Sequence, residues 1–166
     1  IYNNYDPSIG NFNKDVLSVV TINGVYTETA FIDMSINGHL IKVLTKYQIK
    51  SSLRGNGNVP ALIMITGWGT PYDFDVSTYV TAGYAVIQYD WRGTFGGTYT
   101  YPSTLMTLYP AELSRLNQAV NPNADYTNQA SVTDISSLKQ QDMYYWFAMP
   151  RRVLAYAKAL SWDIDS

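Results

Sequence analysis

The stretches VPALIMITGWGT (59–70) and AGYAVIQYDWRGTFGG (82–97) decide the fold of this chain. Each holds a short apolar run, Ala61–Ile65 and Tyr84–Tyr89, that stops at a glycine-rich loop. Neither run alternates with polar residues, which is typical of strands buried on both faces of a parallel sheet. The spacer from Pro71 to Ala82 is long enough for a crossover helix. Because ligands bind at the carboxyl ends of such strands, both loops are expected at a binding edge.

The composition of the chain limits the classes of function. Its 166 residues suffice for one domain, and a net charge of -2 without a basic stripe argues against nucleic acid as a partner. The absence of Cys excludes disulfides and thiolate chemistry, and a single His restricts metal and triad arguments. No apolar run reaches the roughly 18 to 20 residues that span a bilayer. Abundant Tyr, with few Lys and Glu, indicates a secreted or cell-surface protein.

The rest of the chain is predicted to contribute leading strands and a helix. Residues 1–15 form an N-terminal arm, and three β-prone runs follow at 16–22, 25–34 and 40–49, separated by the turn pairs Asn23-Gly24 and Asn37-Gly38. Lys42, Lys46 and Lys50 fall on one side of the third run. Residues 51–58 have the composition of a loop, and 105–133 of an excursion with a short helix near 111–120.

The strongest helical pattern covers residues 142–162. Alanines and leucines favour a helix there, and apolar residues recur every three to four positions. Pro150 conflicts with this pattern, so it either kinks the helix or marks the first turn of a shorter one. The apolar stripe comprises Tyr145, Met149, Val153, Tyr156 and Leu160.

The predicted fold class is α/β, with antiparallel leading strands followed by parallel strands and crossover helices. A further parallel strand should follow the helix 142–162, but the chain stops at Ser166. We therefore expect residues 16–166 to be one incomplete domain whose sheet is finished by other residues.

Several motifs resemble those of the α/β-hydrolases, in particular the acetyl xylan esterase and cephalosporin-C deacetylase family. The resemblance covers about Tyr26 to Ser166, and the X-prolyl dipeptidase and cocaine-esterase-like hydrolases are similar over Gly83 to Gly97. The matching motifs are Gly67-Trp68-Gly69, the strand Ala82–Val86, Asp90-Trp91-Arg92-Gly93 with Gly96-Gly97, Tyr144-Tyr145 before the helix 151–160, and Asp163-Ile164-Asp165.

The chain departs from these hydrolases at the nucleophile, because it contains no G-x-S-x-G. In this fold the triad order is Ser, Asp or Glu, then His, so the resemblance implies that all three lie beyond Ser166 or on another chain. It further implies the N-terminal half of an ester hydrolase that acts on small esters or acetylated carbohydrate without a metal or organic cofactor. Its partner would be the C-terminal remainder, and oligomers are possible.

The resemblance places an oxyanion-hole donor at the backbone N–H of Trp68, with Gly67 and Gly69 permitting the turn and lining the substrate. The alternative is a tight turn with a packed Trp. Arg92 is expected to brace the next loop with Asp90 as its partner or as a cap, in preference to a catalytic carboxylate.

The remaining candidate residues have simpler interpretations. His39 follows a hairpin turn and is expected to face solvent. Asp73 and Asp75 supply too few oxygens for Ca²⁺ and favour a helix cap, and Asp163 with Asp165 favours a solvated turn. Several aromatic residues are candidates for stacking on sugar rings, but such residues more often fill cores and interfaces. They are Trp91, Tyr99, Tyr101, Tyr109 and Trp146.

A second hypothesis belongs to a different class. A non-catalytic surface or assembly protein could reuse the hydrolase half-fold, because an exposed sheet edge pairs with other chains. Continuation of the reading frame into G-x-S-x-G separates the two hypotheses.

Overall fold

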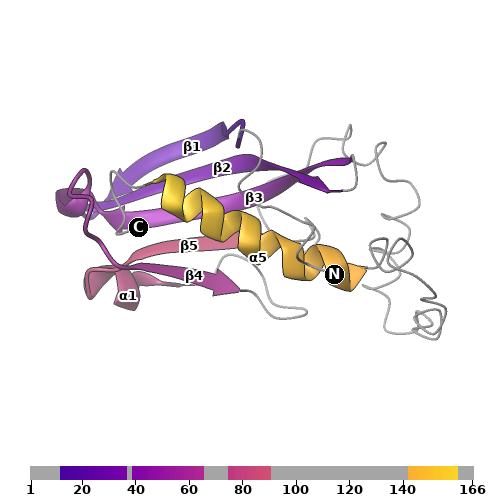
Figure 1. Cartoon of the computed structure of the whole chain (residues 1–166). Helices are drawn as coiled ribbons and strands as arrows, with labels where there is room; N and C mark the ends of the chain where they lie inside the picture. Colours follow the sequence, from indigo (N-terminus) through magenta and orange to yellow (C-terminus); the bar gives the residue numbers. More distant parts are fainter. Residues whose placement is uncertain (1–11, 37–38, 66–74, 91–141, 161–166) are drawn as a thin grey trace.

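The chain folds around one mixed sheet that carries a helix on each face (Figure 1). The computed structural model describes residues 12–36, 39–65, 75–90 and 142–160. Helix α5 (Asp142–Ala159) packs on one face, and the short helix α1 (Ser77–Thr81) packs on the other. Among these residues no helix is both long and apolar enough to cross a membrane.

The sheet contains five strands in the order β1-β2-β3-β5-β4. The pairs β1–β2, β2–β3 and β3–β5 are antiparallel, whereas β4 and β5 are parallel. Antiparallel leading strands followed by a parallel pair fit the α/β class that the sequence predicts. The strands are β1 (Asp15–Ile22), β2 (Val25–Ile36), β3 (His39–Lys50), β4 (Ala61–Ile65) and β5 (Ala85–Asp90).

The first turn follows the chemistry of its sequence. Asn23 and Gly24 have φ angles of 51° and 75°, the left-handed conformation that a two-residue hairpin turn requires. This confirms the predicted turn between β1 and β2. The second turn pair, 37–38, lies outside the described residues, but Ile36 pairs with His39 on either side of it. The expected loop begins with a short 3₁₀ helix, η2 (Ser51–Leu53).

The prediction of burial on both faces is confirmed for β5 and wrong for β4. The side chains of Ala85 to Tyr89 are all buried, because β5 lies between β3 and β4 and under both helices. Strand β4 is only half-buried, and Ile65 is 56% exposed. The physical reason is position, since β4 is an edge strand within the described sheet.

The crossover between β4 and β5 contains a helix, as predicted. Helix α1 has five residues, fewer than the spacer allowed, and residues 66–74 lie outside the described part. Val76 and Val80 are buried against Val86, which points away from α5. The crossover therefore covers the face of the sheet opposite α5.

The structure confirms the predicted apolar stripe at four of its five members, and the side chain of the fifth, Tyr145, lies outside the described part. Met149, Val153, Tyr156 and Leu160 are buried in the core under the sheet face, together with Ala148 and Ala157. Pro150 lies inside the helix, eight residues after its start, so the interpretation as the first turn of a shorter helix is wrong. The stripe stabilises α5 through packing, which outweighs the one hydrogen bond that a proline removes.

Candidate functional site

The carboxyl ends of the two parallel strands lie side by side at one end of the sheet. Ile65 at the end of β4 pairs with Tyr89 near the end of β5, and the two strands, which lie side by side in Figure 1, are parallel. Leu44 of β3 lies opposite Asp90, so the first residues of β3, from His39, extend beyond the carboxyl ends of β4 and β5. The carboxyl ends of β4 and β5 therefore lie at the same end of the sheet as the start of β3.

The residues predicted for the site follow β4 in the sequence or lie at and just after the end of β5. Gly67, Trp68, Gly69 and Arg92 lie outside the described residues, so the oxyanion role and the bracing role stay predictions. Asp90 is the last residue of β5, and the structure describes its backbone but not its side chain.

The other candidates are also mostly outside the described part. The backbones of His39 in β3 and Trp146 in α5 are described, whereas their side chains are not. The interpretations of these residues stay predictions. The same holds for the residues wholly outside it, namely Asp73, Trp91, Tyr99, Tyr101, Tyr109, Asp163 and Asp165.

Strand β5 places the phenol of Tyr89 and the amide of Gln88 on opposite faces of the sheet. Tyr89 is fully buried on the α5 face, and its hydroxyl has no hydrogen-bond partner among the described residues. Burial raises the pKa of Tyr89, so the phenol stays protonated and cannot serve as a base near neutral pH. On the other face Gln88 Nε2 donates to Gln48 Oε1 at 3.3 Å, and Gln48 Nε2 donates to Thr27 Oγ1 at 3.3 Å. This row of amides links three strands.

Asp75 acts at the start of helix α1. Its Oδ1 accepts a hydrogen bond of 2.8 Å from the backbone N–H of Ser77, and the side chain is exposed. The backbone and side-chain hydrogen bonds from Ser77 lower the pKa of Asp75 below its ordinary 3.8. Asp75 thus binds the backbone N–H of the first residue of α1, as its expected role at the helix start requires. The N-cap position itself belongs to Val76, which makes no side-chain cap hydrogen bond, so the expectation that Asp75 is the cap residue is wrong.

This contact makes a titration prediction. A carboxyl whose pKa is lowered on folding stabilises the fold above its unfolded pKa and loses that contribution as pH falls through the folded value. In a carboxyl NMR titration, Asp75 should have a pKa below 3.8. Ser77→Pro removes both donors while keeping a residue suited to the first helical position, so it should return the pKa to its ordinary value. Ser77→Ala removes only the weaker donor and should raise the pKa less. A wild-type pKa at or above 3.8 would contradict this account.

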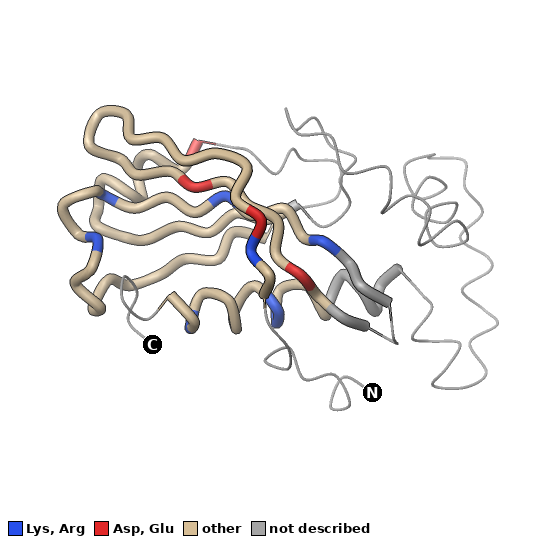
Figure 2. The backbone as a smooth tube through the Cα atoms, turned by 90° about the horizontal axis from the view of Figure 1, so that it is seen from above, with Lys and Arg blue, Asp and Glu red and all other residues tan. Residues whose placement is uncertain are grey.

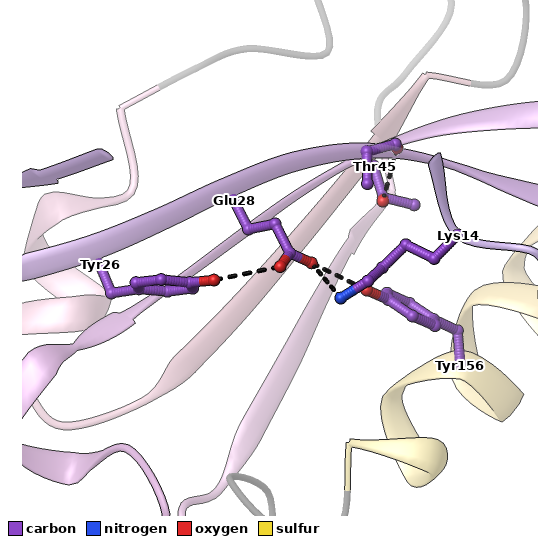
Figure 3. Close-up of polar contacts among 6 residues, drawn as sticks. Lys14, Tyr26, Glu28, Thr45 and Tyr156 are labelled. Carbon is purple, nitrogen blue, oxygen red and sulfur yellow. Dashed lines mark hydrogen bonds and ion pairs between the residues drawn. The ribbon is translucent and has the colours of Figure 1, made fainter. Parts of the chain in front are cut away.

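Sequence reasoning missed a buried carboxylate between β2 and α5. Glu28 is only 8% exposed, on the face that α5 covers. It accepts hydrogen bonds from Lys14 Nζ at 2.8 Å, Tyr26 Oη at 3.0 Å and Tyr156 Oη at 3.3 Å (Figure 3). A buried charge is tolerated only when it is paired in this way. The cluster thus joins the N-terminal segment, β2 and α5.

The chemistry of this cluster is structural. Burial, followed by the negative charge of Glu28, raises the pKa of the Tyr156 hydroxyl and keeps it a donor. Both carboxylate oxygens of Glu28 accept hydrogen bonds from described donors, so the carboxylate is engaged in contacts that join these elements. One signal in the sequence could have revealed it: Glu28 interrupts the inward series formed by Tyr26, Ala30 and Ile32.

A second buried carboxylate lies on the opposite face of β2. Asp33 Oδ1 accepts from Lys42 Nζ at 2.9 Å, and Oδ2 accepts from Asn13 Nδ2 at 2.9 Å. Its backbone carbonyl accepts from Arg152 Nε at 2.7 Å, and its N–H donates to the carbonyl of Phe12 at 2.7 Å. Residues 12–14 of the expected arm thus pack against the sheet and α5.

Within the described ranges no group of three or more His, Asp or Glu residues could hold a metal ion. No protein-family model, curated protein or solved structure matches this chain.

Proposed function

We propose that this chain is the N-terminal portion of a serine hydrolase of the α/β-hydrolase fold, a carboxylic esterase acting on acetyl or other small esters. One observation supports the proposal most directly. Ile65 pairs with Tyr89 in the parallel pair of strands, so β4 and β5 end side by side. The Gly67-Trp68-Gly69 motif follows the first of these strand ends in the sequence, and the Asp90-Trp91-Arg92 motif begins at the second. In open α/β sheets this end of the strands is where ligands bind.

The proposed chemistry is acyl transfer. A serine attacks the ester carbonyl, a histidine takes and returns the proton, and an acid orients the histidine. The backbone N–H of Trp68 donates to the oxyanion that develops, while Arg92 and Asp90 brace the loop beside it. Because the chain has no G-x-S-x-G, the proposal places the triad beyond Ser166 or on a second chain. No cofactor takes part.

The free edge of β4 suits the proposed partner. No described strand pairs with β4 on its outer side, and the last residue of β4, Ile65, is 56% exposed. A parallel strand added beside β4 by the C-terminal remainder would cover this edge. The choice of acetylated carbohydrate as substrate, and of a secreted or cell-surface location, rests on the family resemblance and the composition respectively.

Hydrolysis of aryl esters by the full-length product of the gene tests this proposal. We expect faster turnover of p-nitrophenyl acetate than of longer acyl chains, with no dependence on added metal. The 166-residue chain alone should be inactive and serves as the control, because it lacks the nucleophile elbow. Absence of ester hydrolysis by the correctly folded full-length product would overturn the proposal.

A further inference from the structure

Strand β1 carries a concentration of exposed aliphatic side chains. Among the described residues, the large hydrophobic side chains with more than a third of their surface exposed number nine, and five of them lie in β1. Ile22 is 64% exposed and Val19 is 51% exposed. The five are Val16, Leu17, Val19, Val20 and Ile22.

These side chains are exposed on both faces because β1 is an edge strand with a bulge. Strand β1 pairs with β2 on one side, and no described strand lies on its other side. The register shifts between Val16 and Ser18, so the pairs switch faces at this point. After the bulge, Val19 lies opposite Glu28 on the α5 face, and Val20 lies opposite Thr27 on the other face.

The charge pattern of β1 favours a particular kind of partner. No charged residue occurs from Val16 to Ile22, although edge strands are commonly protected by inserted charges. Figure 2 shows the charged residues of the described chain as separated positions with uncharged lengths of strand between them. A partner recognised through opposite charge would find nothing to pair with here. Recognition must therefore rest on main-chain hydrogen bonds and aliphatic contacts, and a second β1 offers both over the same length.

Charge also selects the orientation of that second strand. In a parallel arrangement, Asp15 would lie beside the Asp15 of the other copy, and like charges directly opposite are destabilising. In an antiparallel arrangement centred beside Val19 and Val20, Asp15 instead lies near the uncharged Asn23-Gly24 turn. Only the antiparallel arrangement has the self-complementary symmetry of a closed dimer.

We propose that β1 is a homodimer interface, in which two copies pair β1 with β1 antiparallel about a two-fold axis beside Val19 and Val20. The paired copies then share one continuous sheet of ten strands, twice the five of one chain. This interface lies at the opposite edge of the sheet from β4, so it is independent of the proposed esterase function and of any strand added there.

Sedimentation equilibrium of the 166-residue chain tests the interface. We expect a dimer of twice 18.7 kDa that dissociates on dilution, within a range of about 1 to 100 µM. Val20→Lys places two ammonium groups beside the axis and should weaken dimerisation at least about tenfold. Leu154→Lys is the matched control, because Leu154 is 49% exposed on α5 and away from β1. It should leave the dimer intact, and circular dichroism should show both variants folded.

A cross-linking experiment gives a readout that does not depend on the lysine variant folding. The chain has no Cys, so Val20→Cys introduces the only thiol, and a short bismaleimide should join two copies of this variant. Leu154→Cys should stay uncross-linked. A monomer of 18.7 kDa throughout the concentration range would overturn the proposal. A dimer that survives Val20→Lys, or one that cross-links equally through Leu154→Cys, would also overturn it, because it would use another surface such as the β4 edge.

Discussion

Replacing Trp68 with proline in the full-length hydrolase should lower kcat about 10²- to 10³-fold, which corresponds to about 2.7 to 4 kcal/mol of barrier. Proline has no backbone N–H, so the change removes the proposed oxyanion donor while leaving the triad in place. The donor acts on the charge that develops in the transition state, so KM should change much less than kcat. The measurement is steady-state hydrolysis of an aryl acetate.

Trp68→Phe is the matched control for this prediction. It keeps the backbone N–H and a large apolar side chain, so kcat should stay within about tenfold of the wild type. If Trp68 only packs in a tight turn, the alternative interpretation, then any loss of kcat in Trp68→Phe should follow from a loss of thermal stability. Equal loss of kcat in both variants, at unchanged stability, would contradict the oxyanion role.

Replacing Arg152 with alanine should destabilise the fold by about 3 kcal/mol. Arg152 is 2% exposed, its Nε donates to the Asp33 carbonyl at 2.7 Å, and its guanidinium lies 4.1 Å from the centre of the Phe12 ring. The substitution leaves a cavity, a buried carbonyl without its donor, and an aromatic ring without its cation. Urea unfolding of the 166-residue chain measures the free energy of unfolding.

Two further variants separate the causes of this loss. Arg152→Met fills most of the volume but cannot donate a hydrogen bond, so its cost should be about half that of alanine. Lys158→Ala removes a positive charge from the exposed side of the same helix and should change stability by less than about 0.5 kcal/mol. An Arg152→Ala variant as stable as Lys158→Ala would show that the contact between α5 and β2 contributes little.

The sheet could be predicted from the sequence because local chemistry and tertiary packing agree there. The Asn23-Gly24 pair needs positive φ angles and obtains them, and the mostly apolar run of β5, which lacks polar alternation, matches its burial on both faces. Strand β4 is also a short apolar run but lies at an edge of the described sheet, and strand order depends on long-range pairing that a short pattern does not encode. Pro150 shows tertiary packing overriding a local preference.

The site was less predictable from the sequence, for a different reason. Motif spacing predicts Trp68 and Arg92, but the aim of a backbone N–H depends on loop conformation, which spacing alone does not determine. The contacts of Glu28 join Lys14 and Tyr156, which are 14 and 128 residues away in sequence. Hydrophobic periodicity reports local spacing, so it does not predict partners this far apart in the sequence. The exposure of β1 was likewise hidden, because its aliphatic composition resembles that of a buried strand.

Labelling of the full-length product with a fluorophosphonate probe tests the central claim most directly. We expect one modified serine, located by mass spectrometry in a G-x-S-x-G sequence outside residues 1–166, with labelling slowed by Trp68→Pro and retained in Trp68→Phe. A folded full-length product in which no serine reacts with the probe, or in which the reactive serine lies within residues 1–166, would contradict the account.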